Sequence, residues 1–138
     1  MYKRLTEKSA RTSPEASDPA LLGRTYAIPF DAVWRAALLL AHGGLRGWRL
    51  VSSDDELGII RVDVRAMLVP LEAKALVSVT LDPDGQTRVD MSARGVHRWG
   101  DFGVNRRRIR TFFRVLDREL SVRPDQIVVT WSQAEHPA

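Results

Sequence analysis

The stretch from residue 97 to residue 120, HRWGDFGVNRRRIRTFFRVLDREL, carries the side chains best suited to chemistry in this chain. It contains seven arginines and one tryptophan. Guanidinium groups bind carboxylates and phosphates through paired hydrogen bonds, and an indole ring offers a stacking surface. The sequence therefore predicts a contact surface for an anionic partner, formed by Arg94, Arg98, Trp99, Arg106, Arg107 and Arg110.

The crowding of arginines at the start of a predicted helix favours this hypothesis, because it is locally unfavourable. Arg106, Arg107, Arg108 and Arg110 occupy the first two turns, where positive charge opposes the helix macrodipole. Arg106 and Arg110 are also like charges four residues apart, which costs roughly a few tenths of a kcal/mol. A bound anion would compensate both effects.

An alternative stays open, in which the arginines are only the solvated side of a packed helix. The apolar residues of the stretch repeat at helical spacing, namely Ile109, Phe112, Phe113, Leu116 and Leu120. Asp101 precedes this pattern and is expected to accept hydrogen bonds from the free N–H groups of the first turn. Gly103 would let that turn approach the sheet, and Asn105 would point toward the interior. These three residues are predicted to shape the helix start rather than to contact a partner.

Catalysis is not predicted, because the residues that it usually needs are absent or isolated. The chain has no cysteine, which excludes disulfides, thiolate catalysis and cysteine-based metal sites. Its three histidines, His42, His97 and His136, have no partner at metal-ligand spacing. No serine lies in a nucleophile-elbow motif, and the glycines do not form a phosphate-binding loop. We therefore expect a non-enzymatic protein without catalytic residues, metal ligands or a cofactor.

The net charge of +4 comes entirely from the C-terminal third of the chain. Residues 1–93 contain 12 basic and 12 acidic side chains, whereas residues 94–138 contain nine basic and five acidic ones. This asymmetry indicates an anionic partner, such as an acidic protein surface. Non-specific nucleic-acid binding remains an alternative, although no helix-turn-helix, zinc-finger or RNP motif predicts sequence-specific recognition.

The elements that must position these residues follow from the period of the apolar side chains. Alternation over residues 24–30 predicts a first strand, and helical spacing from Val33 to Ala41 predicts a helix that ends at Gly43. Four strands are then expected within residues 48–53, 58–68, 75–82 and 86–94, followed by the helix of residues 101–120 and a candidate extra strand at 126–132. This order predicts an α+β fold in which an antiparallel sheet of about five strands is packed on one face by two helices, in a helix-grip arrangement.

Composition divides the chain into one domain between two tails. Residues 1–22 are polar, rich in Ser and Pro, and show no period, so they are predicted to be a disordered tail. Residues 23–132 are expected to form a single α+β domain, and residues 133–138 a C-terminal tail. The longest apolar run, residues 36–41, is too short to span a bilayer, and the N-terminal stretch lacks a secretory signal. We therefore expect a cytoplasmic protein with no membrane span.

The run GDFGVNRRRI, residues 100–109, resembles the signature of an uncharacterised bacterial family, the domain of unknown function 1499. That family carries an Asp-Leu-Gly-x-Asn-x-Arg-Arg-Ile type of motif after an Arg/Ser-rich strand. The matching residues here are Asp101, Gly103, Asn105, Arg107 or Arg108, and Ile109. The serines of the family's strand are mostly missing from residues 92–98. The resemblance implies a shared fold unit over about residues 24–120 and no established activity.

Together these patterns predict a small binding or interaction module that contacts an anionic partner through the arginine-rich stretch. A second hypothesis concerns Trp34, Trp48, Phe112 and Phe113, which we expect in the core. In a helix-grip fold the space between sheet and helix can instead stay open and hold a small apolar ligand. A ligand carrier is therefore the alternative function.

Overall fold

The computed structural model of the chain describes residues 9–13, 23–65, 72–95 and 104–128. The strands are β1 (Ser9–Arg11), β2 (Arg24–Tyr26), β3 (Trp48–Asp54), β4 (Ile59–Val64), β5 (Ala73–Leu81) and β6 (Thr87–Gly95). The helical elements are α2 (Phe30–Leu39), a π-helical turn η2 (Leu40–Gly44), α3 (Val104–Glu119) and a 3-10 turn η3 (Pro124–Gln126). The predicted α+β fold is confirmed, with the expected order of strand, helix, four strands and helix after an additional first strand.

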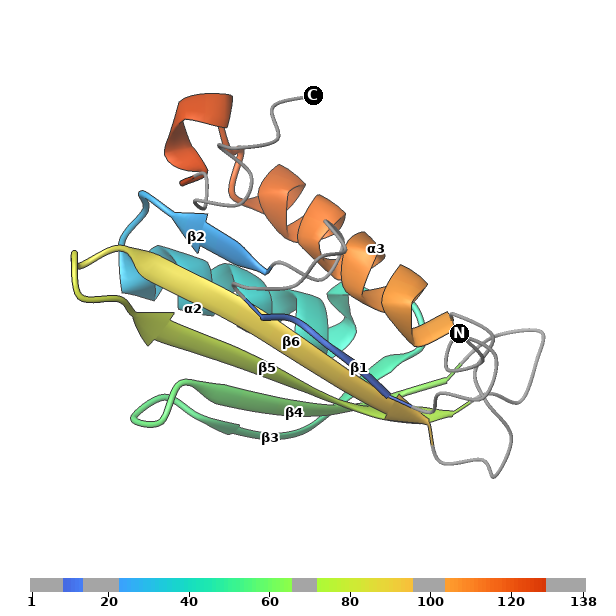
Figure 1. The fold of residues 1–138 in the computed structure, drawn as a ribbon. Helices are drawn as coiled ribbons and strands as arrows, with labels where there is room; N and C mark the ends of the chain where they lie inside the picture. Colours follow the sequence, from blue (N-terminus) through green and yellow to red (C-terminus); the bar gives the residue numbers. More distant parts are fainter. Residues whose placement is uncertain (1–8, 14–22, 66–71, 96–103, 129–138) are drawn as a thin grey trace.

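The strands form one antiparallel sheet in which β3, β4, β5 and β6 are consecutive neighbours. Both β1 and β2 pair with the remaining edge of β6, β1 opposite residues 92–94 and β2 opposite residues 87–89. The described sheet is therefore five strands wide although it contains six strands. Figure 1 shows β1 and β2 beside β6. From β3 to β6, each strand pairs with the next strand in the sequence, so short connections are enough to join them.

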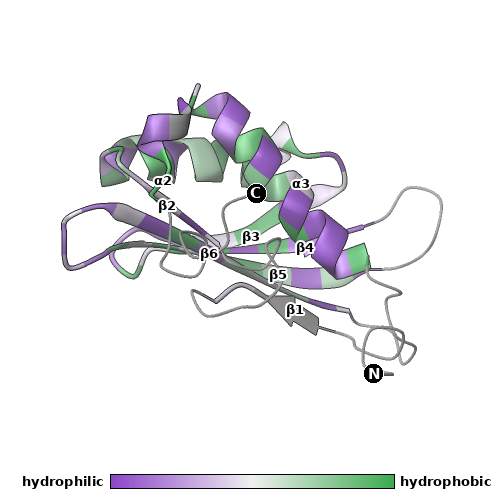
Figure 2. Ribbon diagram, turned by 45° about the horizontal axis from the view of Figure 1, so that its top comes forward, coloured by the Kyte–Doolittle hydropathy of each residue, from purple (hydrophilic) through white to green (hydrophobic). Residues whose placement is uncertain are grey.

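The two helices cover the same face of the sheet, as Figures 1 and 2 show. Alternate residues of β5 and β6 are buried under the helices, and the residues between them lie on the opposite face. In β5 the buried residues are Ala73, Ala75, Val77 and Val79, and in β6 they are Thr87, Val89, Met91 and Ala93. This alternation is what an antiparallel sheet requires when only one of its faces is covered.

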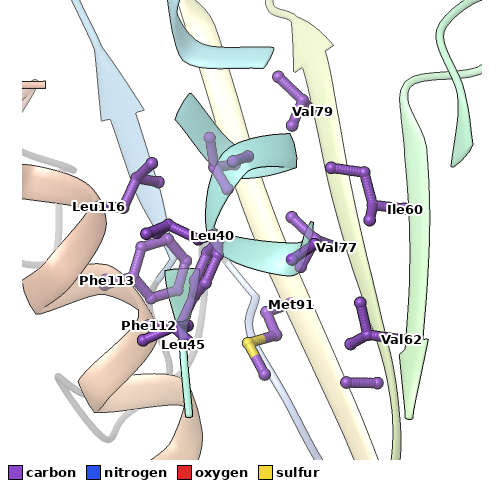
Figure 3. Close-up of a cluster of buried hydrophobic side chains, with 14 of the residues drawn as sticks. Leu40, Leu45, Ile60, Val62, Val77, Val79, Met91, Phe112, Phe113 and Leu116 are labelled. Carbon is purple, nitrogen blue, oxygen red and sulfur yellow. The ribbon is translucent and has the colours of Figure 1, made fainter. Parts of the chain in front are cut away.

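Side chains of the sheet and of both helices meet in one hydrophobic core. In Figure 3, Met91 and Val77 of the sheet point toward Leu40, and Phe112 and Phe113 of α3 lie beside it. Phe112 packs edge-on against Phe113, with ring centroids 5.1 Å apart. These side chains occupy the space between the described parts of the sheet and the helices.

Acidic side chains close two of the hairpins. Asp54 accepts hydrogen bonds from the backbone N–H groups of Glu56 and Leu57, both at 3.0 Å. Asp82 does the same for Asp84 at 3.0 Å and Gln86 at 2.9 Å. Such Asx turns hold the chain in a tight reversal and fix the register of the strands on either side. The acidic residues at 54–56 therefore form a solvated turn.

The main correction to the sequence prediction concerns the N-terminal tail. Residues 9–11, predicted to be disordered, form β1, and the adjacent Thr12 is buried. The Thr12 hydroxyl donates to Asp90 at 2.6 Å and accepts from the backbone N–H of Met91 at 2.9 Å. The backbone N–H of Thr12 donates to the Met91 carbonyl at 2.8 Å. Polar and backbone bonds hold this segment, so it carries no apolar period that a sequence pattern could reveal.

Smaller differences lie at the ends of elements. Phe30 is the first residue of α2 rather than the last of a strand. Leu81, which strict alternation in the strand predicted within residues 75–82 would turn toward the core, is 61% exposed because it lies at the open end of β5. Of the candidate strand at residues 126–132, the described part forms only an isolated bridge between Ile127 and Tyr26, and its end lies outside the described residues. Among the described helices, none is long and apolar enough to cross a membrane.

Candidate functional site

The structure describes only part of the surface predicted from the arginine-rich stretch. Arg98, Trp99, Asp101 and Gly103 lie outside the described residues. Arg106, Arg107 and Arg110 lie in α3, and Arg94 lies near the end of β6. Whether these four arginines form one surface depends on the direction in which each side chain points.

Arg94 does not join the arginines of α3. It follows the buried Ala93 in β6, so it lies on the face of the sheet away from the helices. Its cross-strand neighbour in β5 is Lys74, which is exposed on the same outer face. The prediction treated Arg94 as continuous with the helix start because the two are close in sequence, but the alternation of β6 turns it to the other side.

The arginines of α3 are divided between two sides of the helix. The buried side carries Asn105, Ile109, Phe112, Phe113 and Leu116. Arg106 and Arg110 are spaced four residues apart and lie in line with Asp117, seven residues further on. Arg107 and Thr111 are also four residues apart, and they lie about 100° further round the helix, on the adjoining side. The arginine cluster thus spans two adjoining sides of α3, and of these arginines Arg107 reaches the groove described below while Arg106 and Arg110 do not.

The first side of α3 is attached to β2 by a partly buried polar cluster. The hydroxyl of Tyr26, which is 0% exposed, donates to Asp117 at 2.6 Å. The other carboxylate oxygen of Asp117 lies 3.1 Å from the Arg24 guanidinium, which also lies 5.8 Å from the ring centroid of Phe113. Burial and the hydrogen bond to Asp117 raise the pKa of Tyr26 far above its ordinary value. Asp117 therefore has a structural role, because it joins α3 to Tyr26 and Arg24 of β2.

The second side of α3 borders a groove of about 400 Å³. We call it the arginine groove, and its lining residues are Leu45, Arg46, Trp48, Val64, Arg65, Val104, Arg107, Arg108 and Thr111. These residues come from the turn before β3, from the ends of β3 and β4, and from the first two turns of α3. Four of the nine are arginines and none is acidic. The groove therefore concentrates positive charge beside apolar side chains.

A tight turn positions Arg46 at the groove. The backbone N–H of Trp48 donates to the Leu45 carbonyl at 3.1 Å, which closes a turn with Arg46 and Gly47 at its centre. Gly47 has a φ of 82°, and a Cβ at this position would collide with the Arg65 carbonyl. The N–H of Arg65 donates to the Gly47 carbonyl at 2.9 Å. The turn is thereby fixed against the end of β4, and Arg46 lies beside Arg65.

Two of the four arginines are held by hydrogen bonds. Asn105 is 0% exposed, and its side-chain oxygen accepts a 2.7 Å hydrogen bond from Arg108. Arg65 donates to Glu72 from Nη2 at 2.9 Å and from Nε at 3.2 Å. A buried polar side chain is expected to have a partner, and here Arg108 is one partner of Asn105. The inward direction predicted for Asn105 is confirmed by its burial.

Arg46 and Arg107 are exposed, as Arg65 is, but they differ from the other two arginines in their pairing. Neither of them forms an ion pair with any residue in the described part of the chain. Like charges at one groove repel each other, and a bound anion would relieve that repulsion. A bound anion would therefore be stabilised most by the guanidinium groups of Arg46 and Arg107.

Trp48 supplies the aromatic part of the groove. Its ring stacks on Phe112, with centroids 5.6 Å apart and planes inclined by only 6°. Phe112 is fully buried in the core, so the stacking fixes the plane of the indole. Trp48 is half-buried and lines the groove together with Val64. A bound molecule would meet a rigid apolar surface at this point.

A larger hollow of about 620 Å³ adjoins the groove and shares Trp48, Val64 and Arg65 with it. This hollow contains its own carboxylates. Asp63 lies 2.8 Å from Arg49 and 3.5 Å from Lys74, and Glu72 pairs with Arg65. The hydrogen bond from Arg49 and the charge of Lys74 lower the pKa of Asp63. Because its charges are paired internally, the larger hollow does not favour an anion as the arginine groove does.

The residues that sequence reasoning missed are those that only long-range contacts bring to the groove. Arg46 and Arg65 are far from α3 in sequence, and no local pattern links them to it. Arg108 belongs to the predicted stretch but was not selected, although its spacing of three residues from Asn105 was a usable signal. Of the predicted contact residues, Arg107 is the described one that lines the groove.

Comparisons with known proteins do not assign the chain to a family. No family model matches its sequence, and no curated protein matches it. Among solved structures, the X-ray crystal structure of protein CV1439 from Chromobacterium violaceum is similar at 14% sequence identity and a TM-score of 0.38. The match covers 83% of this chain and 94% of that chain. A likeness at this level carries no inference about function, and the resemblance to the domain of unknown function 1499 stays a prediction.

Proposed function

We propose that the protein is a non-enzymatic binding module whose anionic partner contacts the arginine groove. The observation that carries the proposal is the composition of the groove, whose described lining residues include four arginines and no carboxylate, and whose Arg46 and Arg107 are exposed and form no ion pair with a described residue. Guanidinium groups bind carboxylate and phosphate oxygens through paired, charge-assisted hydrogen bonds. The residues of this site differ from those predicted from the sequence, since Arg94, Arg106 and Arg110 do not line the groove.

The packing of the core supports a surface site over an interior one. Core side chains occupy the space between the described sheet and helices, where the alternative hypothesis would place a small apolar ligand. Phe112 and Leu116, which face that space, are both 0% exposed. The cytoplasmic location expected from the sequence stays a prediction.

A double substitution at Arg46 and Arg107 tests the proposal. We expect Arg46→Gln with Arg107→Gln to weaken the binding of inorganic pyrophosphate, measured by isothermal titration calorimetry, by about tenfold or more. The matched control is Arg35→Gln with Arg114→Gln, which removes the same charge from exposed positions on α2 and α3 outside the groove. The control is expected to bind as the unmodified protein does.

Two outcomes would contradict the proposal. The first is equal loss of binding in both double variants, which would mean that only the total charge matters. The second is unchanged binding in the groove variant, or no measurable binding in the unmodified protein. Thermal melts of all three proteins, followed by circular dichroism, show that each is folded.

A further inference from the structure

We infer that the ligand of the arginine groove is a small amphipathic anion, with one acidic group bound by Arg46 and Arg107 and an apolar body lying against Trp48. This inference rests on the proposed function and adds the size and the chemical class of the ligand. Three features of the groove support it: its volume, the division of its lining into two kinds of side chain, and the fixed positions of its central residues.

The size of the groove matches a small molecule. Small-molecule pockets in proteins usually enclose roughly 300–1,000 Å³, and the groove measures about 400 Å³. A flat macromolecular interface would instead spread over a much larger surface. The concave lining is therefore of the size that buries a compact ligand.

The lining is divided between apolar and cationic side chains. Leu45, Trp48, Val64 and Val104 are apolar, and the other lining residues are four arginines and Thr111. An inorganic anion would leave the exposed parts of Trp48 and Val104 in water, and a purely apolar ligand would remove water from the guanidinium groups of Arg46 and Arg107 without compensation. A ligand with one acidic group and one apolar body satisfies both parts, since binding sites of this kind combine apolar walls with few polar groups.

The central side chains of the groove are already fixed before a ligand binds. The Trp48 ring is stacked on the buried Phe112, and Arg108 is bonded to the fully buried Asn105. Arg65 also pairs with Glu72 at 2.9 Å, but this pair is exposed to solvent and restrains Arg65 less. Side chains that are already ordered lose little entropy when a ligand binds. Asn105 is therefore a positioning residue, which holds a guanidinium at the groove from inside the core.

The inference can be tested with three probes that divide the ligand into its parts. These are 1-naphthyl phosphate, which has both parts, inorganic phosphate, which has only the anion, and 1-naphthol, which has only the ring. We expect 1-naphthyl phosphate to bind about tenfold or more tightly than either of the other two in isothermal titration calorimetry. Binding of the naphthyl ester should shift the backbone amide resonances of residues 45–48 and 107–111.

Two variants test the apolar part and the cationic part of the groove separately. Thr111→Phe places a ring in the groove from a half-exposed position outside the core, and it is expected to weaken the binding of 1-naphthyl phosphate about tenfold more than it weakens the binding of phosphate. Arg46→Gln with Arg107→Gln should weaken both the ester and phosphate. Arg35→Gln with Arg114→Gln is again the matched control and should leave all three probes unaffected.

The outcomes distinguish this inference from the proposed function. If phosphate binding depends on Arg46 and Arg107 but the ester binds no more tightly than phosphate, the inference is wrong and the proposed function stands. If 1-naphthol binds as tightly as the ester, the groove is an apolar site and the inference is also wrong. If neither anion responds to the groove substitutions, both the inference and the proposed function fail. Tighter binding of the ester that is lost in Thr111→Phe supports both.

Discussion

Replacing Tyr26 with phenylalanine removes one hydroxyl from the centre of the contact between β2 and α3. The hydroxyl is completely buried and donates to the Asp117 carboxylate at 2.6 Å. A hydrogen bond to a charged group contributes about 1.5–3 kcal/mol to stability. Asp117 is partly exposed and keeps Arg24 as a partner, so the lower end of this range applies. We expect Tyr26→Phe to lower the free energy of unfolding by about 1.5 kcal/mol at pH 8.

The same substitution should also change how stability depends on pH. Burial and the hydrogen bond to Asp117 raise the pKa of Tyr26 in the folded protein above its ordinary value of 10.0. A group whose pKa is raised by folding contributes stability below its unfolded pKa, and that stability is lost as pH rises toward the folded pKa. Above pH 10 the unfolded state ionises while the folded state keeps the proton, which costs about 1.4 kcal/mol per pH unit.

The stability advantage of the unmodified protein over Tyr26→Phe should therefore fall from about 1.5 kcal/mol at pH 8 to nearly zero at pH 11. Urea unfolding of both proteins at pH 8, 9, 10 and 11, followed by far-ultraviolet circular dichroism, measures this difference directly. Other groups that titrate in this range are common to both proteins and cancel. A difference that stays constant up to pH 11, or that increases, would refute the reasoning.

Two further substitutions test how the groove and the N-terminal strand are held. Gly47→Ala should destabilise the protein by about 2 kcal/mol or more in urea unfolding, because the added Cβ meets a carbonyl at a positive φ. Gly85→Ala is its matched control, with a similar φ of 78° but open space around the Cβ, and should cost only about 1 kcal/mol. Equal costs would mean that the close approach of Gly47 is unimportant. Thr12→Val should cost about 1–3 kcal/mol, since it leaves the buried N–H of Met91 without its hydroxyl acceptor. An unchanged stability would show that residues 9–12 contribute little to the fold.

Apart from β1, the strands and the two main helices of this fold could be predicted because each is encoded by a local pattern. The spacing of Ile109, Phe112 and Leu116 predicts a helix with one buried side, and the structure buries all three. Alternation in β5 and β6 predicts which residues face the helices, and Leu81 departs from it only because the strand ends there. A turn such as the one at Asp82 is similarly recognisable from its own residues. One covered face of an antiparallel sheet follows from these patterns taken together.

The site depended on contacts that no local pattern contains. The sequence placed Arg94 and Arg107 on one surface, but the pleat of β6 and the turn of α3 direct them to opposite sides of the sheet. It gave no reason to place Arg46 beside Arg107, because that proximity comes from a turn fixed against the end of β4. Periods of 2 and 3.6 residues determine which side of an element is buried, and so the sequence alone determined the elements and the core. The packing of separate elements decides which exposed side chains meet, and only the tertiary structure brought four arginines to one groove.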